Sequence, residues 1–181
     1  SFVGTVLGLF WGRRLTAKNF REFVEIDETS LARAQEIVKR RKGLVFATLH
    51  YGDWELLGLT ATFVGLDLTI VQEVMRNEPL QNVFSRLRGV TGHRVVPQAF
   101  AASKVFRAIR EGGGTALLVD LGSNRRGGGL WLDFFGLPVF SSPTFAALAL
   151  RSGAPILFAH ATPLPNGRVR PARGWWRRRS G

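Results

Sequence analysis

The sequence predicts an α/β fold, with a largely parallel central sheet flanked by helices. Short apolar runs typical of buried strands recur along the chain, and amphipathic helical segments separate them. No internal repeat interrupts this alternation. The chain has 181 residues, of which 45% are hydrophobic, which is enough for one domain with its own core.

The first predicted elements are two helix–strand pairs. Residues 28–41 place apolar side chains at helical spacing, and residues 44–49 read as a buried strand. Residues 53–64 form the next predicted helix, with Asp53 in the N-cap position. The second strand is expected at residues 66–72.

The same alternation continues to about residue 162. The further expected elements are a helix at 79–90, a strand at 93–97, a helix at 100–112, a strand at 115–120, a helix at 142–153 and a strand at 154–160. From residue 163 the pattern gives way to Pro, Gly and Arg. The sequence thus predicts one domain over residues 1–162 and a basic irregular tail over residues 163–181.

The charge balance is strongly basic. Lys and Arg total 25 and Asp and Glu total 13, so the net charge is +12. Such a surface favours anionic partners, which include nucleic acid, anionic lipid headgroups and an acidic carrier protein. The chain has no cysteine, which excludes disulfides and cysteine-ligated metal sites. No apolar run reaches the roughly 20 residues that a membrane-spanning helix needs.

Polar side chains follow two of the predicted strands. His50 comes directly after residues 44–49, and Asp120 ends the strand at 115–120. In open α/β folds, ligands bind beyond the carboxyl ends of the strands. If the two strands are parallel, both side chains lie on the same edge of the sheet.

The spacing of His50 and Glu55 suggests a histidine–carboxylate pair. The two residues are five apart, so they meet only if the chain turns at Tyr51 and Gly52. Glu55 in the first helical turn would then bond the imidazole, fix its tautomer and make it a general base. A structural histidine and an acid that stabilises the helix dipole are the alternatives.

A metal site is not expected. One histidine and two acids could bind a cation, but the other histidines, His93 and His160, lack the spacing of metal ligands.

The stretch "LHYGDWELLG" at residues 49–58 resembles the His-x4-acid block of the bacterial lipid A biosynthesis lauroyl/myristoyl acyltransferases, within the wider glycerol-phosphate acyltransferase superfamily. Segments similar to three further blocks of that family follow at residues 77–92, 110–120 and 127–157. Together the likeness covers about residues 13–160. Asp53 stands where the family often has Asn.

The resemblance implies a glycerol-phosphate-acyltransferase-like fold, residues 1–162 being the acyltransferase domain without the family's N-terminal membrane anchor and C-terminal part. It implies transfer of a fatty acyl chain from an acyl carrier protein thioester to a hydroxyl of a lipid A precursor or similar glycolipid. His50 would be the general base and Glu55 would orient it. No cofactor is implied. The expected location is the cytoplasmic face of the bacterial inner membrane.

The resemblance also supplies candidates for substrate binding. These are Tyr51, Gly52, Asp53, Arg88, Asp120, Arg125 and Arg126. The three arginines are candidates for phosphate or headgroup contacts, because guanidinium groups bind phosphate oxygens in a bidentate manner. Plain surface charge is the alternative reading of these arginines.

Other functions stay open at this point. Glu73 and Leu121 depart from the Arg and Gln usual in the family. Glu73 fits another acceptor, such as a phosphatidylinositol mannoside, an ornithine-type lipid or a lysophospholipid. A folded but inactive family member is a further possibility. A non-enzymatic basic module for anionic membrane or nucleic acid would explain the charge but not the pairing of His50 with an acid. Nucleic acid is therefore not an expected partner.

Overall fold

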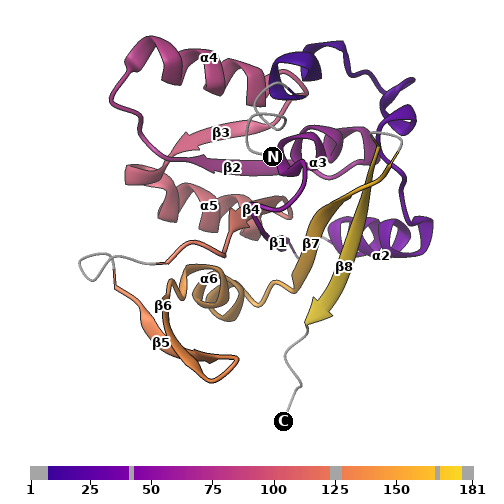
Figure 1. Ribbon diagram of the computed structural model, residues 1–181. Helices are drawn as coiled ribbons and strands as arrows, with labels where there is room; N and C mark the ends of the chain where they lie inside the picture. The colour runs from indigo at the N-terminus through magenta and orange to yellow at the C-terminus, as the bar shows by residue number, and fades with distance from the viewer. Residues whose placement is uncertain (1–7, 41–42, 123–127, 166–167, 177–181) are drawn as a thin grey trace.

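A computed structural model describes residues 8–40, 43–122, 128–165 and 168–176 (Figure 1). Its centre is a six-stranded sheet with the order β3-β2-β4-β1-β7-β8. The strands are β1 (Leu44–Thr48), β2 (Leu68–Gln72), β3 (Arg94–Pro97), β4 (Gly114–Leu118), β7 (Ile156–Pro163) and β8 (Val169–Trp176). The first five run parallel to one another, and β8 pairs with β7 in the antiparallel direction. The predicted α/β fold with a largely parallel sheet is confirmed.

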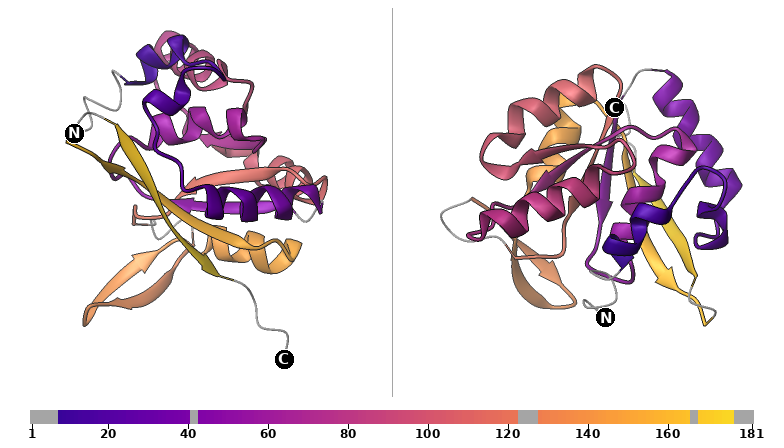
Figure 2. Two further views of the ribbon diagram at one scale, coloured as in Figure 1. Left: turned by 90° about the vertical axis from the view of Figure 1, so that its right-hand side faces the viewer. Right: turned by 90° about the horizontal axis from the view of Figure 1, so that it is seen from above.

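Helices cover both faces of this sheet (Figure 2). They are α2 (Glu28–Lys39), α3 (Trp54–Thr60), α4 (Glu78–Gly89), α5 (Ala101–Arg110) and α6 (Thr144–Ser152). Short 3-10 turns lie at Gly12–Arg14, Phe20–Glu22, Thr62–Val64 and Gln98–Phe100. In the part of the chain that the structure describes, none of the helices has both the length and the apolar character to cross a membrane.

Strand β1 shows how the core is divided between the two faces. Leu44 and Phe46 pack into a cluster that includes Ala34 of α2, whereas Val45 and Ala47 pack into the cluster beneath α5 and α6. Because side chains alternate along a strand, a strand covered on both faces must be apolar throughout. The sequence of β1 meets this requirement, and the strand ends where polar residues begin.

A separate two-stranded hairpin extends from the body of the protein (Figures 1 and 2). It consists of β5 (Leu130–Phe134) and β6 (Leu137–Ser141), which are antiparallel. At its base, Ser141 forms an isolated bridge with Gly122, shortly after β4.

The prediction of an irregular tail is wrong for residues 169–176. They form β8, which pairs with β7 over eight residues. An edge strand has only one hydrogen-bonded neighbour, so it accepts polar residues and a proline that a central strand excludes. Pro171, opposite Ala161, is such a residue. A composition rich in Arg and Pro therefore does not exclude a strand at the edge of the sheet.

Candidate functional site

His50 and Asp120 meet at the carboxyl edge of the sheet. Strands β1 and β4 are parallel neighbours, with Thr48 opposite Leu118. His50 lies two residues beyond the end of β1, and Asp120 two residues beyond the end of β4. The prediction that both groups share one edge is confirmed.

The Asp120 carboxylate binds His50 with both of its oxygens. The His50 Nδ1 atom lies 2.9 Å from Oδ1, and the backbone N–H of His50 donates to Oδ2 at 2.8 Å. The two side chains are about one-third exposed, at 29% and 31%. Burial by itself would raise the pKa of the Asp120 carboxyl, but the hydrogen bonds from the His50 ring and backbone outweigh it and hold that pKa below its ordinary value. The carboxylate is therefore charged at neutral pH and can orient the imidazole.

The turn after His50 depends on Gly52. Its φ of +65° lies in the left-handed region, and a Cβ atom there would lie 1.6 Å from the carbonyl oxygen of Ala161 on β7. Only glycine fits this approach. The turn then brings Trp54 back onto His50, with the two rings edge to face at a centroid distance of 4.9 Å.

Asp53 caps α3, as predicted. Its Oδ1 atom accepts the backbone N–H of Leu56 at 3.0 Å. Burial raises the pKa of the Asp53 carboxyl, although the bond from Leu56 acts in the opposite direction.

The expected hydrogen bond from Glu55 to His50 is a wrong prediction. The Glu55 carboxylate is bound by Arg88 of α4, whose Nε donates at 3.1 and 3.2 Å and whose Nη2 donates at 2.5 Å. Both side chains are largely buried. Glu55 lies in the first turn of α3 and faces α4. The His50 imidazole faces the end of β4 instead, where it bonds the Asp120 carboxylate.

An apolar pocket lies next to this edge, between the sheet and the helices α2 and α3. Its wall includes Ile26, Leu31, Ala34, Phe46, Leu57 and Leu157. Thr48 and Trp54 line the end nearest His50. The Thr48 hydroxyl is buried and has no hydrogen-bond partner among the described residues.

A family model for bacterial lipid A biosynthesis acyltransferases matches residues 9–168. The chain belongs to this family. Among curated proteins, a search finds no match. Since the matched region contains every residue of the site described above, the site lies in a lipid A biosynthesis acyltransferase domain.

In this lipid A biosynthesis acyltransferase domain, Asp120 has a contact that the sequence analysis does not predict. It is expected there as a substrate-binding residue, and the structure shows that its carboxylate bonds His50. Its place at the end of a neighbouring parallel strand was the signal that could have identified it.

The structure describes four of the other predicted substrate-binding residues, Tyr51, Gly52, Asp53 and Arg88. Tyr51 is half exposed, and its ring lies edge to face with the His160 ring at a centroid distance of 5.6 Å. Gly52 and Asp53 shape the turn and the helix start, and Arg88 is paired with Glu55. Arg125 and Arg126 lie outside the described residues.

Proposed function

We propose that this family member transfers a fatty acyl group from an acyl carrier protein thioester to a hydroxyl of a lipid A precursor or a similar membrane glycolipid. The observation that carries the proposal is the pair of hydrogen bonds between the Asp120 carboxylate and His50. One involves the ring and the other the backbone N–H, at the carboxyl edge of the sheet. A histidine fixed in this way is suited to general-base catalysis.

The proposed reaction needs one base and no covalent enzyme intermediate. Asp120 holds Nδ1, so Nε2 is the nitrogen that takes the proton from the acceptor hydroxyl. The hydroxyl oxygen attacks the thioester carbonyl carbon and forms a tetrahedral intermediate. As the intermediate collapses, the carbon–sulfur bond breaks and the leaving thiolate takes the proton from Nε2. The products are the new ester and the free thiol of the carrier.

The apolar pocket supports an acyl substrate. Aliphatic and aromatic side chains from both the sheet and its covering helices form its wall, which suits a hydrocarbon chain and not a sugar or nucleotide. Trp54 contacts the His50 ring and also lines the pocket. A chain bound there would have its carbonyl end next to the proposed base.

Glu55 receives a different role from the one expected from spacing. By binding Nε and Nη2 of Arg88, it fixes the guanidinium plane. We assign Glu55 as a positioning residue for Arg88, and Arg88 as a candidate contact for a phosphate of the acceptor.

The test is acyl transfer from a labelled acyl carrier protein to a lipid A precursor in detergent. His50→Ala is expected to abolish transfer, and Asp120→Asn to lower kcat by about 10²- to 10⁴-fold with a smaller change in KM. Glu55→Gln is expected to act mainly on the KM for the acceptor. Asp67→Asn is the matched control, because this exposed carboxylate precedes β2 at the opposite edge of the sheet.

Circular dichroism of each variant separates loss of the base from loss of the fold. Full activity of a folded His50→Ala protein would overturn the mechanism. Normal kcat in Asp120→Asn together with a large loss of kcat in Glu55→Gln would return the role of the orienting acid to Glu55.

A further inference from the structure

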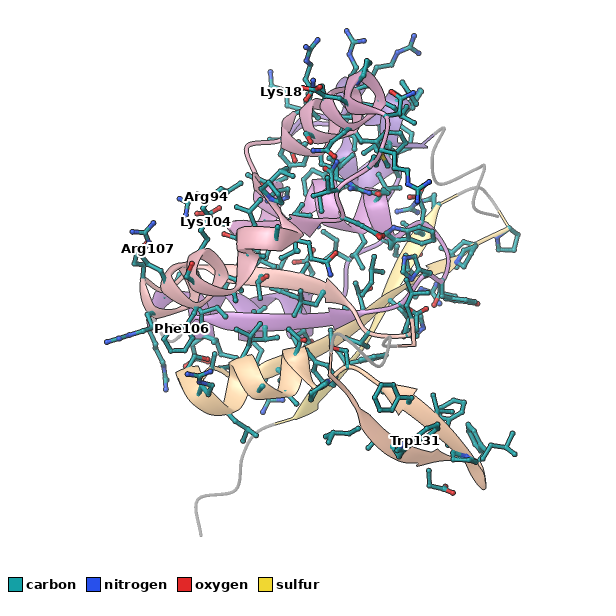
Figure 3. The ribbon with its side chains drawn as sticks, turned by 90° about the vertical axis from the view of Figure 1, so that its left-hand side faces the viewer. Lys18, Arg94, Lys104, Phe106, Arg107 and Trp131 are labelled. Atoms are coloured by element: carbon teal, nitrogen blue, oxygen red, sulfur yellow. The ribbon has the colours of Figure 1, made fainter. Side chains whose placement is uncertain are left out.

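The hairpin β5–β6 is the most apolar exposed element among the described residues. All five residues of β5 are exposed. Trp131 is 62% exposed and Phe134 61%, and on the other strand Leu137 is 68% exposed. Figure 3 shows Trp131 on this hairpin, away from the helices and the central sheet. Contiguous exposed apolar surface of this kind marks an interaction site.

Both faces of the hairpin carry apolar side chains. Side chains alternate along a strand, so Leu130, Leu132 and Phe134 lie on one face. Trp131 and Asp133 lie on the other face, where the Trp131 and Phe140 rings have a centroid distance of 5.2 Å. A hairpin that docks on a protein would bury one face and keep the other polar. Apolar residues on both faces call for a medium that surrounds the hairpin.

The tip carries an aromatic residue where the backbone disfavours one. Phe134 pairs with Leu137, so the turn is the two-residue segment Phe135-Gly136, with φ values of +54° and +79°. Two positive φ values define a type I′ turn, for which Asn-Gly is the preferred pair. A phenylalanine there is unfavourable, because a side chain with a Cβ atom is strained at positive φ. Phe135 is 90% exposed, and its edge-to-face contact with the neighbouring Phe134 ring, at a centroid distance of 4.7 Å, leaves most of the side chain in solvent.

Charge agrees with a lipid partner. Asp133 is the one ionisable side chain in residues 128–141, and the chain as a whole carries +12. An apolar projection with a single carboxylate on a strongly basic protein matches the arrangement by which peripheral proteins bind anionic bilayers, with aromatic side chains at the headgroup level. Strands of five residues extend roughly 17 Å at about 3.4 Å per residue, which is enough for the tip to enter the interfacial layer.

The base of the hairpin is bonded to the segment that carries Asp120. Its base bridge joins Ser141 to Gly122, and Gly122 is two residues beyond Asp120. We propose that β5–β6 inserts its tip, Phe134 to Leu137, into the surface of an anionic bilayer and so brings His50 and Asp120 to acceptors held there. This inference deepens the proposed function, on which it rests for the nature of the acceptor.

The decisive variant is Phe135→Asn. It creates the preferred Asn-Gly pair, so the hairpin is expected to keep or gain stability while it loses its most exposed ring. In co-sedimentation with vesicles of three parts phosphatidylcholine and one part phosphatidylglycerol, its partition coefficient is expected to fall at least about threefold. Leu150→Gln is the matched control, because Leu150 on α6 is 52% exposed and its replacement is expected to leave binding unchanged.

A fluorescent label gives a second readout. The chain has no cysteine, so Leu137→Cys and Leu150→Cys each introduce a unique thiol. An environment-sensitive dye is expected to shift to shorter wavelength on vesicle addition at position 137 and not at position 150. Equal shifts, or equal binding by wild type and Phe135→Asn, would overturn the proposal.

Two outcomes separate this inference from the proposed function. Transfer to a detergent-dispersed acceptor by a wild-type protein that does not bind vesicles would overturn the bilayer proposal and leave the function standing. Vesicle binding that Phe135→Asn weakens, in a protein without transfer activity, would support the surface and overturn the function.

A lipid-free dimer that Phe135→Asn dissociates, measured by light scattering, would assign the hairpin to a second copy and overturn the bilayer proposal.

Discussion

Asp53 combines a favourable cap with an unfavourable charge. Burial raises the pKa of its carboxyl above 3.8. A carboxyl whose pKa is raised by folding stabilises the folded state below its unfolded pKa, and this contribution is lost as the pH rises through the folded pKa. At neutral pH the ionised Asp53 therefore opposes folding, even though its side chain caps α3.

Asp53→Asn is expected to stabilise the protein at neutral pH. Asparagine keeps the cap on the Leu56 N–H without the buried charge. In urea unfolding, the midpoint of the variant should exceed that of wild type at pH 7, and the gap should close as the pH falls toward the ordinary carboxyl pKa. A gap that stays constant between pH 7 and pH 4 would contradict this explanation.

The residue scale also shows why part of the site could be predicted and part could not. The His50 position and the Asp53 cap follow from local pattern, because a strand end and a helix start are both visible in sequence. The acid that bonds His50 is 70 residues away and depends on which strand lies next to β1. Glu55 is much closer to His50 in sequence, but in the structure it binds Arg88 and not the imidazole.

At the scale of elements, the Glu55–Arg88 pair joins α3 to α4. The Glu55 side chain is 12% exposed and that of Arg88 18%, so removal of one partner leaves a poorly solvated charge. Glu55→Ala is expected to lower the free energy of unfolding by about 1–3 kcal/mol, the cost of leaving a buried polar group without its partner. The double variant with Arg88→Ala should lose less than the sum of the two single changes.

The chain offers a control for this prediction. The Arg21–Glu28 pair is more than half exposed on both sides, so Glu28→Ala should cost less than about 1 kcal/mol. Urea unfolding of the two single variants provides the comparison. A larger loss for Glu28→Ala than for Glu55→Ala would contradict the role given to burial.

Elements differed in how well sequence predicted them. The covered strands β1 and β4 were found, because burial on both faces requires an apolar run. The edge strand β8 was missed because pairing with β7 stabilises it without an apolar sequence. The hairpin turn was missed because Phe135-Gly136 lacks the residues that usually signal a type I′ turn.

At the scale of the whole molecule, exposed basic residues of neighbouring elements lie together on the surface. Figure 3 shows Arg94, Lys104 and Arg107 together near α5 and β3. All three side chains are exposed. Since exposed charges steer association and are screened by salt, an acidic carrier protein would be expected to bind more slowly as ionic strength rises.

This yields a prediction for the donor. At subsaturating donor, transfer from acyl carrier protein should fall several-fold between 50 and 500 mM salt, whereas transfer from an acyl pantetheine thioester should change little. Initial rates with both donors in the same detergent provide the measurement. Equal salt dependence for the two donors would mean that the carrier protein does not use this surface charge.

The fold class was the most predictable feature at this scale, since it depends on the alternation of apolar strands and amphipathic helices along the whole chain. The partners were not predictable to the same degree. Net charge selects anions in general, and only the placement of basic and apolar residues on the surface distinguishes a protein donor from a lipid.

The pairing of His50 with Asp120 has a consequence for biogenesis. The two residues come from strands that become neighbours only after β2, β3 and the helices between them have been synthesised and the sheet has closed. A nascent chain that has released β1 but not β4 holds an imidazole without its carboxylate. Such a chain lacks the oriented imidazole, so the His50–Asp120 pair is assembled only when β4 has docked beside β1.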